Sequence, residues 1–163
     1  MNRRLAIYLN DHLAGEVVGT ELAKRALREN RGSSFGEFLA WLLGQILEDR
    51  ATLERLMAGL GVPESRLKRA LALTLERVGR LKLNGQLTGY SPLSRLVELE
   101  GLALGVTGKR ALWVALQEIA GTEPRLREFD FDELRRRAEE QLAGLERLRI
   151  EAARLALAVE SPV

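Results

Sequence analysis

The chain has 163 residues, a length that suits a single domain able to bury roughly 70% of the surface that its unfolded form exposes. It has no cysteine, which excludes disulfides, thiolate nucleophiles and cysteine-ligated metal sites, and no apolar run reaches the ~18 residues of a membrane span. The net charge is only +2, from 25 basic and 23 acidic residues that are interleaved, so the sequence lacks the one-sign patch of a nucleic-acid-binding surface. Because the first residues also become polar too early for a signal peptide, we expect one cytoplasmic domain covering residues 1–163.

The first predicted helix covers residues 3–29, where apolar side chains recur at helical spacing and Arg31-Gly32 follows as a stop. Two polar residues interrupt its apolar side. Glu16 falls near the middle of that side, and His12 falls on its flank one turn earlier. Because residues at i and i+4 are neighbours on a helix, we expect these two side chains to be close enough to touch.

A second helix is predicted for residues 33–60, almost immediately afterwards. Ser33 or Ser34 serves as its N-cap, and Glu37 stands three residues after Ser34, as in a capping box. So short a joint between two long helices predicts an antiparallel helical hairpin.

Asp49 interrupts the apolar face of this second helix. It stands between Ile46 and Leu53, at a position where the helical period requires an apolar residue. Burying an unpaired carboxylate is costly, so we expect Asp49 to have a partner on a neighbouring helix.

The middle of the chain predicts a shorter third helix over residues 63–79, with Pro63 in its first turn. Asn84-Gly85 then lies between alternating leucines, a pattern compatible with a tight β-hairpin. Because the neighbouring segments are helical, we favour an ordered turn there.

The fourth predicted helix covers residues 91–120, since Ser91 provides an N-cap and Pro92 occupies the first helical position. Apolar residues lie on two of its faces, which indicates two neighbours. The face that we assign to the bundle interior contains Leu93, Leu96, Ala103, Leu104, Ala111 and Val114, with the acid Glu100 among them. The other face, a predicted interaction face for the short helix or another subunit, contains Leu99, Leu102, Val106 and Trp113.

The last predicted helix covers residues 130–159 and has two polar residues on its inward side, Gln141 and Arg149. Counting residues from the last helix connection places Arg149 at about the depth of Glu100. We therefore expect a buried ion pair between Glu100 and Arg149.

A second polar cluster is expected around Glu16 and Asp49, because counting from the first connection places these two acids at similar depth. The whole predicted set of buried polar residues is His12, Glu16, Asp49, Glu100, Gln141 and Arg149, with Thr107 as an alternative to Gln141 beside Asp49. Our hypothesis is that these pairs fix the register between helices, because buried ion pairs are weak evidence for added stability.

The predicted architecture is all-α: four long helices in an antiparallel bundle, with a long crossover that contains the short helix between the second and third long helices. This connectivity resembles that of the ferritin-like superfamily. The segments YLNDHLAGEVVGTEL, LKLNGQLTGYSPLSRLVELEGLALG and GKRALW also resemble a group of uncharacterised bacterial helical proteins with the same layout. The resemblance covers nearly the whole chain and consists of the layout of the helices and a general similarity of sequence.

The ferritin-like resemblance implies a dimetal site built from a Glu on each of two helices and a Glu-x-x-His on each of the other two. The acids that correspond to it are Glu16, Asp49 or Glu48, Glu100, and Glu139 or Glu140. The required histidines are replaced by Ala51, Thr52, Leu142 and Ala143, and the chain's only histidine, His12, stands on the wrong helix. The sequence thus departs from the dimetal pattern.

These observations predict a non-catalytic bundle that acts through binding or homo-oligomeric assembly, as a homodimer or with a helical protein partner, without a cofactor, nucleic acid or membrane. The sequence has no serine nucleophile motif, phosphate-binding loop or metal-spaced histidine pair. The alternative is a ferritin-like protein that binds iron or manganese through His12, Glu16, Asp49 and Glu100. A third possibility is an adaptor for a larger partner.

Overall fold

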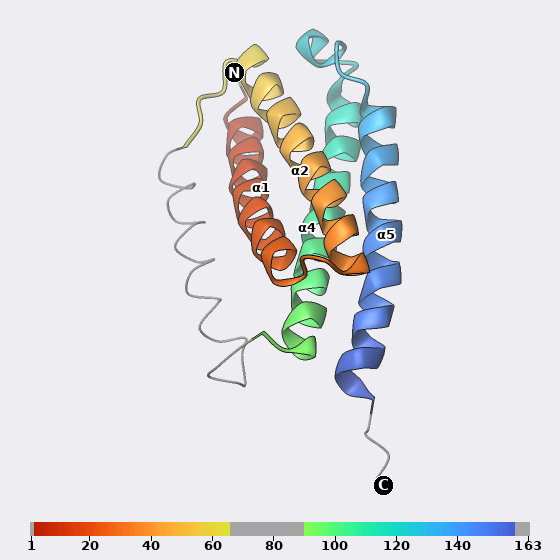
Figure 1. The fold of residues 1–163 in the computed structure, drawn as a ribbon. Coiled ribbons are helices and arrows are strands. Elements are labelled where there is room, and N and C mark those ends of the chain that lie inside the picture. Colours follow the sequence, from red (N-terminus) through yellow and green to blue (C-terminus); the bar gives the residue numbers. More distant parts are fainter. Residues whose placement is uncertain (1, 66–89, 159–163) are drawn as a thin grey trace, which may run out of the picture.

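The computed structural model describes residues 2–65 and 90–158, which form helices and short connections without a β-strand (Figure 1). The four long helices are α1 (Arg3–Glu29), α2 (Ser34–Gly59), α4 (Pro92–Ile119) and α5 (Phe131–Leu157), and a short 3-10 helix, η1 (Pro124–Leu126), connects the last two. The predicted helix ends agree with these bounds to within two residues. Residues 63–65 are not helical, and the rest of the predicted short helix and the Asn84-Gly85 turn lie outside the described residues.

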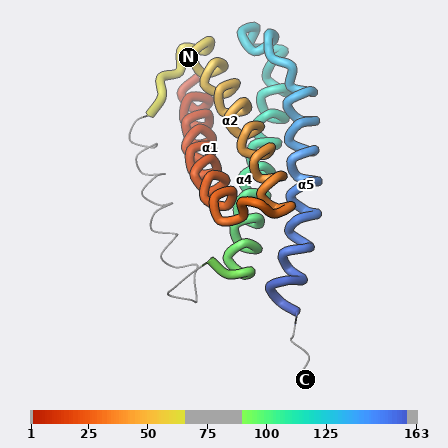
Figure 2. Tube along the Cα trace, viewed as in Figure 1, coloured from red at the N-terminus to blue at the C-terminus, as the bar shows by residue number. Residues whose placement is uncertain are grey.

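The helices form a bundle in which neighbours are antiparallel (Figures 1 and 2). α1 packs against α2 and α4, and α5 packs against α4 and α2. The connection after α2 leaves and returns at opposite ends of α1, because the Ser65 amide donates to Asn10 Oδ1 at 2.6 Å and Asn30 Nδ2 donates to the Tyr90 hydroxyl at 2.8 Å. α2 and α4 therefore run parallel, as the predicted crossover requires.

Local sequence signals explain where the helices begin. Ser33 Oγ accepts a hydrogen bond from the Gly36 amide at 3.3 Å, and Ser91 Oγ accepts one from the Ser94 amide at 3.1 Å. Both serines are therefore N-caps, as predicted. Since the cap of α2 is Ser33, the alternative cap at Ser34 with its capping box does not form.

The interior consists of two apolar clusters, one toward each end of the bundle. The cluster near the α1–α2 turn is built around Phe35, Leu39, Leu42, Leu99, Leu102 and Leu145. The cluster near the α4–α5 connection is built around Leu9, Leu53, Leu56, Leu112, Trp113 and Leu126. Fully buried polar side chains from α2, α4 and α5 lie between the two clusters and form the centre of the candidate site.

The predicted orientation of α4 is wrong. The predicted interaction face, Leu99, Leu102, Val106 and Trp113, is buried in this chain's own core. Of the face assigned to the interior, Leu96 is buried as predicted, but most of the rest is exposed: Leu104 is 74% exposed, and Leu93 and Val114 are also exposed. Two apolar faces on one helix give the same periodic signal, and only packing against α1 and α5 decides between them.

Within the described ranges, no helix has the combination of length and hydropathy that crossing a membrane requires.

Candidate functional site

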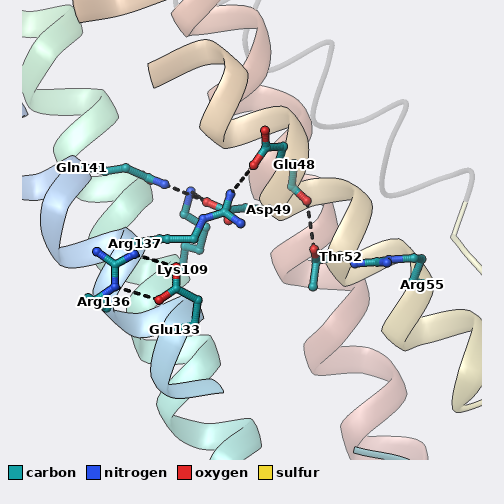
Figure 3. Close-up of polar contacts among 9 residues, drawn as sticks. All are labelled: Glu48, Asp49, Thr52, Arg55, Lys109, Glu133, Arg136, Arg137 and Gln141. Carbon is teal, nitrogen blue, oxygen red and sulfur yellow. Dashed lines mark hydrogen bonds and ion pairs between the residues drawn. The ribbon is translucent and has the colours of Figure 1, made fainter. Parts of the chain in front are cut away.

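Asp49 is the centre of a buried polar network near the middle of the bundle (Figure 3). Lys109 Nζ of α4 lies 2.7 Å from Asp49 Oδ2, and both side chains are 1% exposed. From α5, Gln141 Nε2 donates to the same oxygen at 2.9 Å, and Arg137 Nη2 lies 3.0 Å from Oδ1. The expectation that Asp49 has a partner on a neighbouring helix is confirmed, and so is the contact with Gln141.

Lys109 was not found by sequence reasoning, although a signal for it exists. It continues the helical spacing of the buried residues Val106 and Trp113, so it is a lysine at a core position of α4. Assigning the opposite face of α4 to the interior concealed this signal. Thr107, the suggested neighbour of Asp49, is exposed and donates to the Ala103 carbonyl oxygen at 2.8 Å instead.

Arg137 connects the buried network to the surface of α2. Its Nη2 lies 2.9 Å from Glu48 Oε2 as well as 3.0 Å from Asp49 Oδ1. Within residues 2–65 and 90–158, the buried atoms Arg137 Nε and Gln141 Oε1 have no hydrogen-bond partner. The network thus joins three helices at one depth, and sliding any of them by a turn would place a charge against the apolar clusters.

Glu16 of α1 approaches the same depth without joining the network. Its side chain is half-buried, and its carboxylate has no hydrogen-bond or ion-pair partner in the part of the chain that the structure describes. Burial raises the pKa of Glu16 to about 7; the Asp49 charge acts in the same direction, and Lys109 and Arg50 partly oppose it. Glu16 is therefore a carboxyl group that changes charge near neutral pH.

Glu16 lines a cavity of about 200 Å³ between α1 and α4, which we call the Glu16 pocket. Four of its lining residues are glycines, and a Cβ atom at any of them would have open space around it: Gly15, Gly19, Gly105 and Gly108. The remaining wall is half apolar, from Ile46, Leu102, Leu104 and Val106, and half charged or titratable, from Asp11, His12, Glu16 and Lys109. The pocket therefore combines an apolar part with two carboxylates, an imidazole and a lysine.

His12 lines the Glu16 pocket one turn before Glu16, as the i, i+4 spacing indicates. Its ring contacts the Tyr8 ring edge to face, with centroids 4.5 Å apart. Burial lowers the pKa of His12, and the charge of Asp11 partly offsets this effect. His12 is thus a half-buried residue at the edge of the core and a neutral group at neutral pH.

The predicted buried ion pair between Glu100 and Arg149 is wrong. Their side chains are 47% and 32% exposed, and the closest oxygen and nitrogen are 3.9 Å apart. Arg149 instead binds Glu146 on its own helix at 2.7 Å. The cause is the orientation of α4, which turns Glu100 outward together with Leu104.

The acid that α4 buries instead is Glu98, in a second polar cluster near the α1–α2 turn. Arg25 Nε lies 2.9 Å from Glu98 Oε1, and the Tyr90 hydroxyl donates to Oε2 at 2.9 Å. Burial raises the pKa of Glu98, and the hydrogen bond from Tyr90 and the charge of Arg25 oppose this. Glu98 precedes the buried Leu102 by four residues, a spacing that marks it as a core position.

The residues present do not fit the metal site that the ferritin-like resemblance implies. The Asp49 oxygens are already bonded by a lysine, an arginine and an amide, and Glu100 lies at the surface. The described ranges contain no group of three or more His, Asp or Glu side chains arranged to hold a metal ion. The alternative ligand set of His12, Glu16, Asp49 and Glu100 is therefore not brought together.

No protein-family model matches this chain, and no curated protein or solved structure matches it either. The structure shows a four-helix all-α bundle, and these comparisons identify no ferritin-like family for the chain.

Proposed function

We propose that this chain is a cytoplasmic, non-catalytic helical bundle, ferritin-like in connectivity only, that binds a small molecule in the Glu16 pocket. The observation that carries the proposal is the Glu16 carboxylate, which has no partner among the described residues, in a partly apolar cavity. A pocket that is mostly apolar, with a few polar groups that orient a ligand, is the usual form of a small-molecule site. The antiparallel neighbours and the long crossover support the ferritin-like assignment.

A neighbouring cavity is less suited to binding a ligand than the Glu16 pocket. This second cavity has a volume of about 260 Å³, lies on the other side of Leu104 and is lined by Arg25 and Glu98. Those two residues are already paired with each other. A ligand in the second cavity would have to compete with an existing ion pair, whereas the Glu16 carboxylate has no partner in the part of the chain that the structure describes.

The composition of the Glu16 pocket favours binding over catalysis. The side chains that line it include no hydroxyl or thiol to act as a nucleophile. The ammonium group of Lys109 is bonded to Asp49 at 2.7 Å. What is left is the carboxylates of Asp11 and Glu16 and a neutral imidazole, which can hold a ligand in place.

Filling the pocket tests the proposal directly. In Gly105→Leu the new side chain would occupy open space in the pocket, and in the matched control Gly44→Leu it would occupy open space on the exposed side of α2. Both changes replace a helical glycine with a better helix former, so both variants should fold. We expect a library of cationic, neutral and anionic fragments, screened by ligand-observed NMR, to contain binders of the parent and Gly44→Leu that Gly105→Leu does not bind. Binding that persists in Gly105→Leu, or no binder in the library, would contradict the proposal.

A second candidate function is assembly into a homodimer through the outward face of α4. Leu104 is 74% exposed on that face, and Leu93 and Val114 are also exposed, each about three helical turns from Leu104. Exposed large apolar residues on one side of a molecule can mark an interface. This face replaces the interaction face that the sequence predicted.

A further inference from the structure

We propose that the ligand of the Glu16 pocket is a protonated amine carried on a compact apolar body. This inference rests on the proposed function of the same pocket, and it names the chemical class of the ligand. It follows from the charges around the pocket, from its lining and from its size.

Two carboxylates line the pocket, Asp11 and Glu16, and that of Glu16 has no hydrogen-bond or ion-pair partner among residues 2–65 and 90–158. Lys109 is paired with Asp49 at 2.7 Å, and Arg137 is paired with Glu48 at 2.9 Å. Each of these pairs is neutral, so the ionised carboxylate of Glu16 remains as an excess negative charge in a poorly solvated site. A ligand with one positive charge neutralises it, and a charge-assisted hydrogen bond to a carboxylate is among the stronger polar contacts.

The lining and the size limit the rest of the ligand. Ile46, Leu102 and Val106 are buried and present only carbon atoms, and they lie on the side of the pocket toward the core. A volume of about 200 Å³ accommodates one small ring or a short branched chain. Burial of that apolar body adds affinity, because apolar area is removed from water.

Other ligand classes fit the pocket less well. An anion would be repelled by Glu16, and the nearest cation, Lys109, already donates to Asp49. A metal ion would need several oxygen or nitrogen ligands, whereas no suitable group of three acids or histidines occurs in residues 2–65 and 90–158. A neutral ligand would leave the charge of Glu16 uncompensated.

Amine binding should depend on pH in a defined direction. The charged or titratable groups near Glu16 are Lys109 from α4, Asp49 and Arg50 from α2, and His12 and Asp11 from α1 itself. Because Glu16 has a pKa of about 7, its ionised fraction increases about tenfold from about pH 6 to about pH 8. Like a lysine side chain, an alkylamine stays protonated over that range. Affinity for the amine should therefore rise roughly tenfold as the pH increases, following the ionised fraction of Glu16.

The test compares three probes of one shape: cyclohexylamine, cyclohexanol and cyclohexanecarboxylate. Each is titrated into the protein and followed by amide chemical shifts in NMR. We expect cyclohexylamine to bind at least about tenfold more tightly than either other probe at about pH 8, the difference that a charge-assisted contact provides. Glu16→Gln should remove this preference and the pH dependence, and Gly105→Leu should remove binding altogether. Glu139→Gln, an exposed acid on α5, should behave like the parent.

The outcomes separate this inference from the proposed function. If cyclohexanol or cyclohexanecarboxylate binds as tightly as the amine and Gly105→Leu abolishes that binding, the pocket binds ligands and the amine inference is overturned. Amine binding that Glu16→Gln leaves unchanged, or no amine binding at all, also overturns it. The proposed function itself fails only if no fragment of any charge binds in a way that Gly105→Leu prevents.

Discussion

Lys109 and Arg149 form ion pairs whose surroundings differ greatly. Lys109 and Asp49 are both 1% exposed and 2.7 Å apart, so neither charge has access to water. Arg149 and Glu100 are 32% and 47% exposed and 3.9 Å apart. Removing one member of a buried pair leaves an uncompensated charge in the core, whereas water compensates the charge left by an exposed pair.

We predict that Lys109→Ala lowers the free energy of unfolding by about 3 kcal/mol, the lower end of the range for breaking a buried pair, because Arg137 and Gln141 still contact Asp49. Arg149→Ala should change it little. Urea denaturation at neutral pH measures both. A Lys109→Ala variant as stable as Arg149→Ala would show that Asp49 does not depend on its lysine.

Replacing both members of the pair provides the control for this prediction. The double variant Asp49→Leu with Lys109→Met removes both charges and keeps apolar volume between the two core clusters. Arg137 keeps Glu48 as its partner, and Gln141 Nε2 loses its acceptor. It should be more stable than Lys109→Ala, because apolar replacements of buried ion pairs are often neutral or stabilising.

Glu16 should make stability depend on pH in the direction opposite to that of most acids. Its pKa rises from 4.5 to about 7 on folding, so between these values the folded state binds more protons than the unfolded state. The contribution of Glu16 to the free energy of unfolding is therefore fully present below about pH 4.5, and it decreases as the pH rises to about 7.

We therefore predict that Glu16→Gln, which cannot ionise, has little effect at about pH 4.5 and stabilises the fold above about pH 7 by at most about 3 kcal/mol. Urea denaturation at several pH values measures this difference, with Glu139→Gln as the exposed control. A stability difference that is constant across the pH range would rule out the raised pKa.

At the scale of the helices, the ends could be predicted from the sequence and the orientation of α4 could not. Ser33 and Ser91 mark helix starts because capping is a contact between residues three apart in the chain. The orientation of α4 depends on partners far away in sequence. The partner of Lys109 is Asp49, and the partner of Glu98 is Arg25, and neither pairing is visible from α4 alone.

The first turn of α2 depends on a glycine for a local reason. A Cβ atom on Gly36 would collide with the backbone carbonyl oxygen of Asn30 in the α1–α2 turn, whereas a Cβ atom on Gly44 would meet nothing within 4 Å. Both glycines lie in the same helix, Gly36 buried in its first turn and Gly44 exposed near its middle.

We predict that Gly44→Ala raises the free energy of unfolding by about 1 kcal/mol, the difference in helix propensity, and that Gly36→Ala lowers it by at least as much. Thermal and urea unfolding of the two variants measure the contrast. If both substitutions stabilise the protein equally, the close approach of α2 to the end of α1 is not a constraint on folding.

At the scale of the whole molecule, the candidate site exists only because four helices cross at one depth. Counting residues from the first connection was enough to bring Glu16 close to Asp49, because a short turn fixes the register of α1 against α2. The same counting failed for α4 and α5. Counting residues gave the depth of Glu100 and Arg149 along the bundle. It could not give the rotation of α4 about its own axis, and this rotation places Glu100 at the surface.

The outward face of α4 gives a prediction about the assembled protein. Its apolar residues, Leu93, Leu104 and Val114, are exposed in a single chain, and burying Leu104 alone would be worth roughly 2 kcal/mol per subunit. We predict that the protein is a dimer with twice the 18.2 kDa mass of the chain, and that Leu104→Glu converts it to a monomer because a buried carboxylate would lack a partner.

Light scattering coupled to size-exclusion chromatography measures these masses over a range of concentrations, and circular dichroism confirms that the variant is folded. Leu47→Glu is the matched control, since Leu47 is an exposed leucine on α2, away from the proposed interface. If Leu104→Glu leaves the mass at twice that of the chain, the interface lies elsewhere. If the parent has the mass of a single chain at every concentration, Leu104 is not part of a dimer interface. Leu104 would then act only where it already contributes, as the apolar wall between the Glu16 pocket and the neighbouring cavity.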